Sequence, residues 1–452
     1  MAALAVGAFF LLPLLAASVV GGAMEADGAA DRAAYASGAS PWSWRFRGPD
    51  DIVAGKVFGD AKAAADASGL MVSPYRTGRG EIGFPLSRQA DLRRLNLLRL
   101  DAIAHDGDFS VVVRPTLAAP LVRASIPGLA NPIRLDQLAW HDPAGRPAPP
   151  PERAAMLRLA FTLPRGATLI LRDASLAQAD GRMPEAGIPL PHGMTAEGLL
   201  RWRDRQRAGN PLVTFGDAVA ETPWPAPAGW IIPCLYGLLL GAGALVTRRR
   251  AATTWAGDLA NAALVLAGPV WFIAGLGLTI HDPAAQAVSM FAGGVAYAVF
   301  LTWIRAVPRW HWTRGWHMAG WPLLAIPVAI GIAAVAGHAP VWPPTGRILL
   351  YVGWAFFQQW LMLAVVAALL ARALPRPVAV LLAALAFALL HTPNGLLMQL
   401  CFVAELGWAW WYLHHRSLLP VAVAHAAAAV IMQACMAGGA LRSLEVSARF
   451  LS

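Results

Sequence analysis

Long apolar runs dominate the chain after residue 228, and short polar loops separate them. Most of these runs approach the ~20 residues that an α-helix needs to cross a bilayer. The pattern therefore predicts an all-α polytopic bundle of about eight transmembrane helices over residues 228–440. The runs lie at 229–246, 256–280, 284–304, 318–337, 348–371, 378–393, 395–413 and 418–437.

Residues 27–227 follow a different pattern, in which short alternating apolar and polar runs are bounded by turn residues. A period of two is typical of a strand with one buried face. Several such strands with little helix predict an all-β domain, a sandwich or a jelly-roll-like fold. A helix is expected at 195–207, and the proline-rich stretch 223–227 is expected to link this domain to the bundle. The clearest strands are expected at 42–46, 109–114, 156–161 and 167–172.

A separate apolar run, residues 2–23, precedes the β domain within an N-terminal segment 1–24. No basic side chain precedes this run, and the small residues Gly22 and Ala23 lie near its end. These features fit both a cleaved signal peptide and a retained anchor. Of the two, we favour an uncleaved anchor helix.

The positions of the arginines predict the orientation of the bundle in the membrane. The chain is 57% hydrophobic and 14% charged, with a formal net charge of +10. Basic residues gather in every second loop of the bundle, and cytoplasmic loops carry such an excess. We therefore expect a multi-pass protein of a bacterial inner membrane, with the β domain on the extracytoplasmic, periplasmic side. Because the arginines already have this role, no nucleic-acid partner is expected. The basic loops contain Arg248–Arg250, Arg305, Arg309, Arg314, Arg372, Arg376 and Arg416.

Five polar side chains interrupt the last four apolar runs: Gln358, Gln359, His391, Glu405 and His425. Polar groups inside the hydrocarbon region cost free energy and often mark functional sites. Their comparable depth on four helices predicts one shared cavity, although neighbouring Gln358 and Gln359 point roughly 100° apart on a helix. The alternative for each residue is a lone side chain that a neighbouring backbone group satisfies.

The order of these residues resembles the CAAX-protease and bacteriocin-processing family of intramembrane endopeptidases, also called the CPBP or Abi family. That family carries Glu-Glu-x-x-x-Arg on one helix, Phe-x-x-x-His on the next, and His-x-x-x-Asn or Asp later. Here Gln358-Gln359 aligns with the first motif, Phe387-x-x-x-His391 matches the second, and His425 begins the third. The resemblance implies that the first glutamate activates water, that the histidines orient it and stabilise the oxyanion, and that neither a metal nor another cofactor is bound.

This resemblance covers residues 345–437 and departs from the family in each incomplete motif. Gln358 stands at the catalytic glutamate, and an amide can hydrogen-bond water but cannot accept its proton. Leu363 replaces the arginine and Ala429 replaces the asparagine. We therefore expect Glu405 to act as the base if it faces the histidines. A metal site of two histidines and this carboxylate is the related alternative.

Two functions follow, and both stay open at this point. The first is an intramembrane endopeptidase, weakened by the glutamines, that hydrolyses peptide bonds of a peptide or membrane-protein substrate at the bilayer. The second is a catalytically inactive scaffold whose outer β domain binds a partner or ligand. The substituted motif positions favour the scaffold, whereas His391 and His425 favour the enzyme, because histidines are costly to keep in lipid. The lipid bilayer is a partner in both cases.

Overall fold

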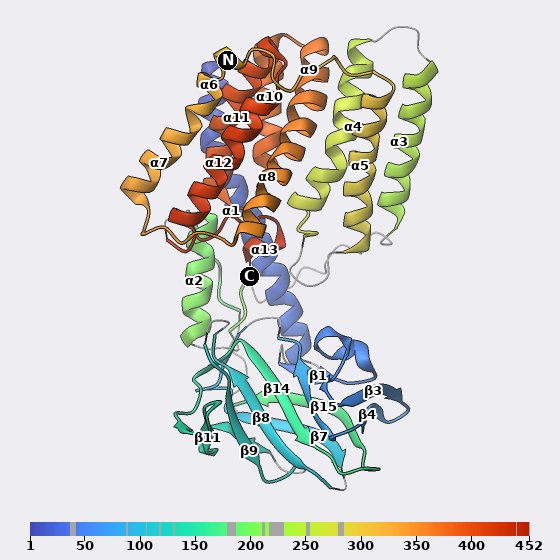
Figure 1. Ribbon diagram of the computed structural model, residues 1–452, viewed down its shortest axis with the longest axis vertical. Helices are drawn as coiled ribbons and strands as arrows, with labels where there is room; N and C mark the ends of the chain where they lie inside the picture. Colours follow the sequence, from blue (N-terminus) through green and yellow to red (C-terminus); the bar gives the residue numbers. More distant parts are fainter. Residues whose placement is uncertain are drawn as a thin grey trace. The chain divides into compact units, whose positions relative to one another are not determined.

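The computed structural model describes residues 1–36, 42–86, 89–104, 106–116, 119–129, 132–178, 187–209, 213–216, 230–249, 254–278, 284–439 and 441–451 (Figure 1). The predicted linker at 223–227 lies outside these residues. The chain forms two compact units. One unit comprises Met1–Ala23, Pro191–Arg201 and Glu221–Ser452, and the other comprises Met24–Leu190 and Trp202–Ala220.

Antiparallel sheets build the second unit. Among the described residues, one sheet has six strands in the order β10-β7-β15-β4-β3 with β1 beside β15, and another has seven in the order β12-β11-β9-β8-β14-β5-β2. A short ladder pairs β6 with β13. The strands are β1 (Ser43–Arg45), β2 (Phe58–Gly59), β3 (Ala61–Asp66), β4 (Gly69–Pro74), β5 (Arg79–Phe84), β6 (Ala90–Asp91), β7 (Leu97–Ala104), β8 (Asp108–Arg114), β9 (Val122–Ile126), β10 (Ile133–Arg134), β11 (Trp140–His141), β12 (Pro147–Ala148), β13 (Arg153–Ala154), β14 (Met156–Thr162) and β15 (Leu169–Ala177).

The two large sheets share one hydrophobic core, which is the arrangement of a sandwich. Leu70 of one sheet and Val111 and Leu159 of the other are fully buried in the same cluster. Trp44 on β1 stacks against Phe84 on β5, with ring centroids 5.1 Å apart, so this contact joins the sheets. The predicted β domain is therefore confirmed. The four strands singled out in the sequence correspond to β1, β8, β14 and β15, and the expected helix is α2 (Ala196–Gly209).

Helices build the first unit and confirm the predicted multi-pass bundle. Within the described part of the chain, seven helices are long and apolar enough to cross a membrane, and the apolar helices Gly320–Ala336 and Arg376–Leu389 are shorter. The helices are α1 (Ala2–Ala36), α3 (Ile231–Arg249), α4 (Trp255–Ala274), α5 (Ala285–Trp303), α6 (Gly320–Leu323), α7 (Ala325–Ala336), α8 (Thr345–Gln359), α9 (Ala368–Ala373), α10 (Arg376–Leu389), α11 (Gly395–His415), α12 (Leu419–Met436) and α13 (Ala448–Leu451).

Two local irregularities lie where the polar residues gather. A π-helical stretch, Trp360–Ala367, joins α8 to α9 and begins directly after Gln359. Such widened turns are frequent at functional sites because they rotate the side chains that follow. The second irregularity is the turn between α10 and α11, which contains His391. Asn394 ends this turn and caps α11, because its side chain accepts a hydrogen bond from the Leu397 backbone amide.

Candidate functional site

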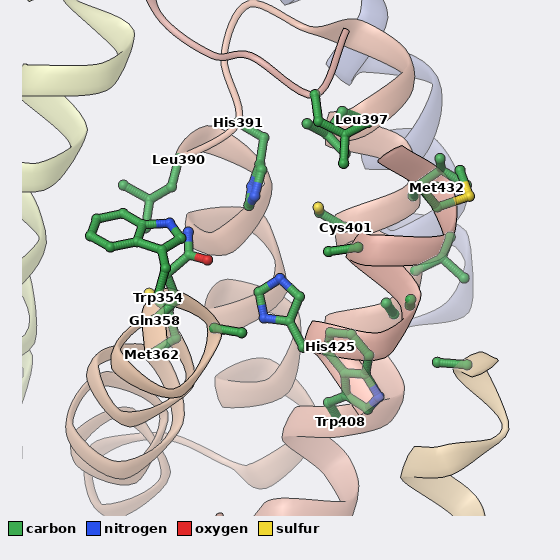
Figure 2. A pocket seen from close by; sticks show the side chains of 18 of the residues that line it. Trp354, Gln358, Met362, Leu390, His391, Leu397, Cys401, Trp408, His425 and Met432 are labelled. Atoms are coloured by element: carbon green, nitrogen blue, oxygen red, sulfur yellow. The ribbon is translucent and has the colours of Figure 1, made fainter. Parts of the chain in front are cut away.

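A cavity of about 1700 Å³ lies among the helices of the bundle. Gln358 on α8, His391 in the α10–α11 turn and His425 on α12 contribute to its wall. Figure 2 shows these three side chains gathered around the same space, with Cys401 and Trp408 of α11 beside them. Three of the predicted polar residues, from three separate segments, therefore border one cavity.

Gln359 and Glu405 lie behind the cavity wall, and both side chains are fully buried. The Nε2 atom of Gln359 is 3.2 Å from Oε2 of Glu405 and 3.2 Å from Nδ1 of His425. An amide nitrogen carries two hydrogens and no acceptor site, so it donates both bonds. Gln358, His391 and His425 thus line the cavity, whereas Gln359 and Glu405 form a buried pair behind it. The pair contacts the cavity-lining residues through the bond from Gln359 to His425.

The amide of Gln359 fixes the tautomer of His425. Because Nδ1 of His425 accepts the Gln359 hydrogen bond, the ring proton of neutral His425 is on Nε2. This assignment follows from the orientation of the Gln359 amide, whose nitrogen faces both Glu405 and His425. His425 consequently presents an N–H donor at Nε2.

His391 has the complementary tautomer. Its Nδ1 lies 2.7 Å from the backbone oxygen of Phe387, one helical turn earlier. A carbonyl oxygen can only accept, so Nδ1 carries the proton and Nε2 keeps its lone pair. Of the two histidines, His391 therefore supplies a proton acceptor and His425 supplies a donor.

Aromatic rings hold the two imidazoles in place. Phe387 contacts both: its ring centroid lies 4.8 Å from that of His391 and 5.5 Å from that of His425, with nearly perpendicular planes. Trp408 also packs against His425, with ring centroids 5.5 Å apart. Because these rings restrict rotation about the side-chain bonds, the orientation of both histidines is set by packing as well as by hydrogen bonds.

Some buried polar atoms of this cluster have no partner among the described residues. These atoms are Oε1 of Gln359 and Oε1 of Glu405. A buried oxygen without a donor costs free energy of about 1–3 kcal/mol. Leu363, which stands at the family's arginine position, is also fully buried and offers no donor. The polar cluster therefore contains two buried oxygens that no described group satisfies.

Metal chemistry finds little support in this geometry. Across the described ranges, no group of three or more histidine, cysteine, aspartate or glutamate side chains is arranged to hold a metal ion. Glu405 is hydrogen-bonded to Gln359 behind the cavity wall, and Ala429 offers no ligand. Glu445 lines the cavity but forms no such group with the two histidines among the described residues.

The sequence argument missed two contributors to the site. Trp408 packs on His425, and its position three residues after Glu405 on α11 was an available signal. Asn394 is fully buried, caps α11 and binds backbone of the C-terminal segment, which no local pattern indicated.

Comparison with known proteins identifies the same region. Residues 340–431 match the family model described as type II CAAX prenyl endopeptidase Rce1-like. No curated protein and no solved structure matches the chain. The matched region contains Gln358, Gln359, His391, Glu405 and His425, and the predicted resemblance is confirmed for this C-terminal part of the chain. The β domain lies outside the match.

Proposed function

We propose that this membrane protein is an intramembrane endopeptidase whose catalytic site relies on two histidines in place of the usual glutamate. The observation that carries the proposal is the pair of opposite tautomers. Phe387 leaves the His391 Nε2 atom free to accept a proton, and Gln359 leaves the His425 Nε2 atom free to donate one. General acid–base hydrolysis of an amide requires both groups at one place.

The chemistry assigns one role to each side chain of the cavity wall. The Gln358 amide orients a water molecule by hydrogen bonding. As the water oxygen attacks the peptide carbonyl carbon, its proton passes to Nε2 of His391, and the oxyanion accepts a hydrogen bond from Nε2 of His425. The carbon–nitrogen bond then breaks, and His391 returns the proton to the leaving amine.

Glu405 and Gln359 act as positioning residues in this proposal. Glu405 holds the Gln359 amide, and that amide holds the His425 ring. The carboxylate therefore influences the oxyanion donor without contacting the substrate. From the sequence, Glu405 was expected to be the base. His391 takes that role here, because Gln359 lies between Glu405 and His425.

The arginine distribution supports a direction in the membrane. The loops between α5 and α6 and between α11 and α12 carry Arg309 and Arg416, and Arg376 is the first residue of α10. We infer that these loops face the cytoplasm of a bacterial cell and that the β domain is periplasmic. Trypsin added to intact spheroplasts should then digest the β domain and spare the loop at Arg309–Arg314.

Hydrolysis by the purified full-length chain in lipid nanodiscs tests the endopeptidase proposal. The probes are quenched fluorescent peptides with a prenylated cysteine near the C-terminus, together with their unmodified counterparts. His391→Ala and His425→Ala should each lower kcat/KM by roughly 100-fold or more. His311→Ala is the matched control, because the exposed His311 side chain contacts Arg314 and does not belong to the cavity wall. Equal activity in all variants would disprove the assignment.

A catalytically inactive scaffold is the second candidate, and one observation favours it. The side chains at the family's catalytic carboxylate and asparagine positions are Gln358 and Ala429, and both line the cavity. An amide and a methyl group supply no base there. In that case no peptide is cleaved, and the β domain carries the function by binding a partner.

A further inference from the structure

The C-terminal segment, defined as residues Leu441–Leu451, runs past the turn that carries His391. Its residues Leu444, Glu445 and Val446 line the same cavity as His391 and Cys401. The segment belongs to no helix or strand until α13 begins at Ala448. The chain therefore places its own irregular main chain at the wall of the candidate site.

Specific hydrogen bonds tie this segment to the turn. The Asn394 side-chain nitrogen donates to the carbonyl oxygens of Ser443, at 2.8 Å, and Glu445, at 3.4 Å. The Ser447 amide donates to the carbonyl oxygen of Thr392 at 2.7 Å. These bonds use main-chain groups of the segment, so they would hold another sequence in the same way.

The segment is held firmly at its ends and weakly in its middle. Leu441, Ser447 and Phe450 are fully buried, and the Ser447 hydroxyl also bonds the backbone of Leu278. Between these anchors, the side chains of residues 442–446 are half-buried or exposed. Leu444 and Val446 pack against the bundle core while only partly buried, and segments with less burial open at lower free energy, so the middle can lift while the anchors stay.

We propose that Thr392–Asn394, which directly follow the cavity-lining His391, form a binding site for polypeptide main chain, and that residues 443–447 occupy it as a strap. A peptide that binds the same groups displaces the middle of the strap and gains access to the cavity. The strap is thus a built-in competitor of the substrate. That the displacing peptide is a substrate rests on the proposed function. That the strap limits access to the cavity does not.

One substitution should weaken the strap without removing the cap of α11. Asn394→Asp keeps the oxygen that caps α11, because aspartate is as good an N-cap as asparagine. It removes the nitrogen that donates to Ser443 and Glu445 and brings a carboxylate against their carbonyl oxygens. Asn261→Asp is the matched control, since the buried Asn261 side-chain oxygen accepts from Tyr297, whereas the strap bonds α4 near its opposite end, at Phe272.

Cys401 supplies a reporter that is independent of catalysis. In full-length chain carrying Cys234→Ala and Cys435→Ala, Cys401 is the remaining thiol, and its reaction with a water-soluble maleimide reports access to the cavity. The loss of two hydrogen bonds should raise the labelling rate in Asn394→Asp roughly tenfold. The control should label at the parent rate.

A second variant and a peptide complete the test. Replacing residues 444–446 by glycine keeps the main-chain acceptors but raises the entropy lost on ordering, so labelling should again accelerate. A synthetic peptide of residues 441–451 should slow labelling of the glycine variant, which keeps Asn394, but not of Asn394→Asp. The same peptide N-methylated at Ser447 cannot donate to Thr392 and should protect less. Parent-level labelling of the folded variants, or equal protection by the N-methylated peptide, would overturn the strap.

The outcomes also separate this proposal from the proposed function. Accelerated labelling in a chain that hydrolyses no peptide would support the strap and contradict the endopeptidase proposal. Hydrolysis with unchanged labelling removes the strap alone.

Discussion

The side-chain amide of Gln359 donates a hydrogen bond of 3.2 Å to the buried carboxylate of Glu405, across the interface between α8 and α11. The two residues are 46 positions apart in the sequence. The same amide nitrogen contacts Nδ1 of His425 on α12. A single glutamine therefore connects three helices of the bundle, and most of the testable consequences of the structure follow from it.

Removal of the Gln359 amide should destabilise the bundle. Gln359→Leu leaves the buried Glu405 carboxylate without its partner among the described residues, and such a loss costs about 1–3 kcal/mol. Gln358→Leu is the matched control, because that side chain is half-buried and borders the cavity. Thermal unfolding of both variants in detergent should show a clearly lower Tm for Gln359→Leu alone. The same Tm in both would mean that the buried bond contributes little.

Glu405→Leu should lower catalysis without changing substrate affinity. The variant removes the acceptor that holds the Gln359 amide, so Gln359 reorients and His425 loses its fixed tautomer. We expect kcat to fall about tenfold, which corresponds to ~1.4 kcal/mol of transition-state stabilisation. KM should stay constant because Glu405 lies behind the cavity wall. Full kcat in the purified variant would exclude this positioning role.

Gln358→Glu should increase peptide hydrolysis. The substitution places a carboxylate in the cavity that His391 and His425 border, and a positioned general base contributes roughly 100-fold or more. The increase should appear in kcat and disappear when His391→Ala is added. A variant that folds but hydrolyses no faster would show that the surroundings of residue 358 no longer suit a base.

Chelation should leave the proposed activity unchanged. Across the parts of the chain that the structure describes, no three metal-ligating side chains are arranged for a metal ion. Dialysis against a strong zinc chelator, followed by addition of zinc, should therefore alter kcat/KM by less than about twofold, which is below 0.5 kcal/mol. Activity that is lost on chelation and restored by zinc would instead support the alternative of two histidines and a carboxylate.

Local sequence patterns identified the membrane helices and several strands of the β domain. Alternating residues marked strands such as β8 and β14, since successive side chains of a strand point to opposite faces. Apolar runs of bilayer length marked the helices of the bundle. The contact between Phe387 and His391 could also be predicted from the sequence, because residues four apart on a helix are neighbours.

Tertiary structure decided how the polar residues are connected. The sequence placed Gln358, His391 and His425 at comparable depth, but helix depth does not fix the rotation of each helix about its axis. The fold brought these three to the cavity, turned Gln359 and Glu405 toward each other behind it, and laid the C-terminal segment on Asn394. These contacts join residues far apart in the chain, and only packing of the helices against one another selects them.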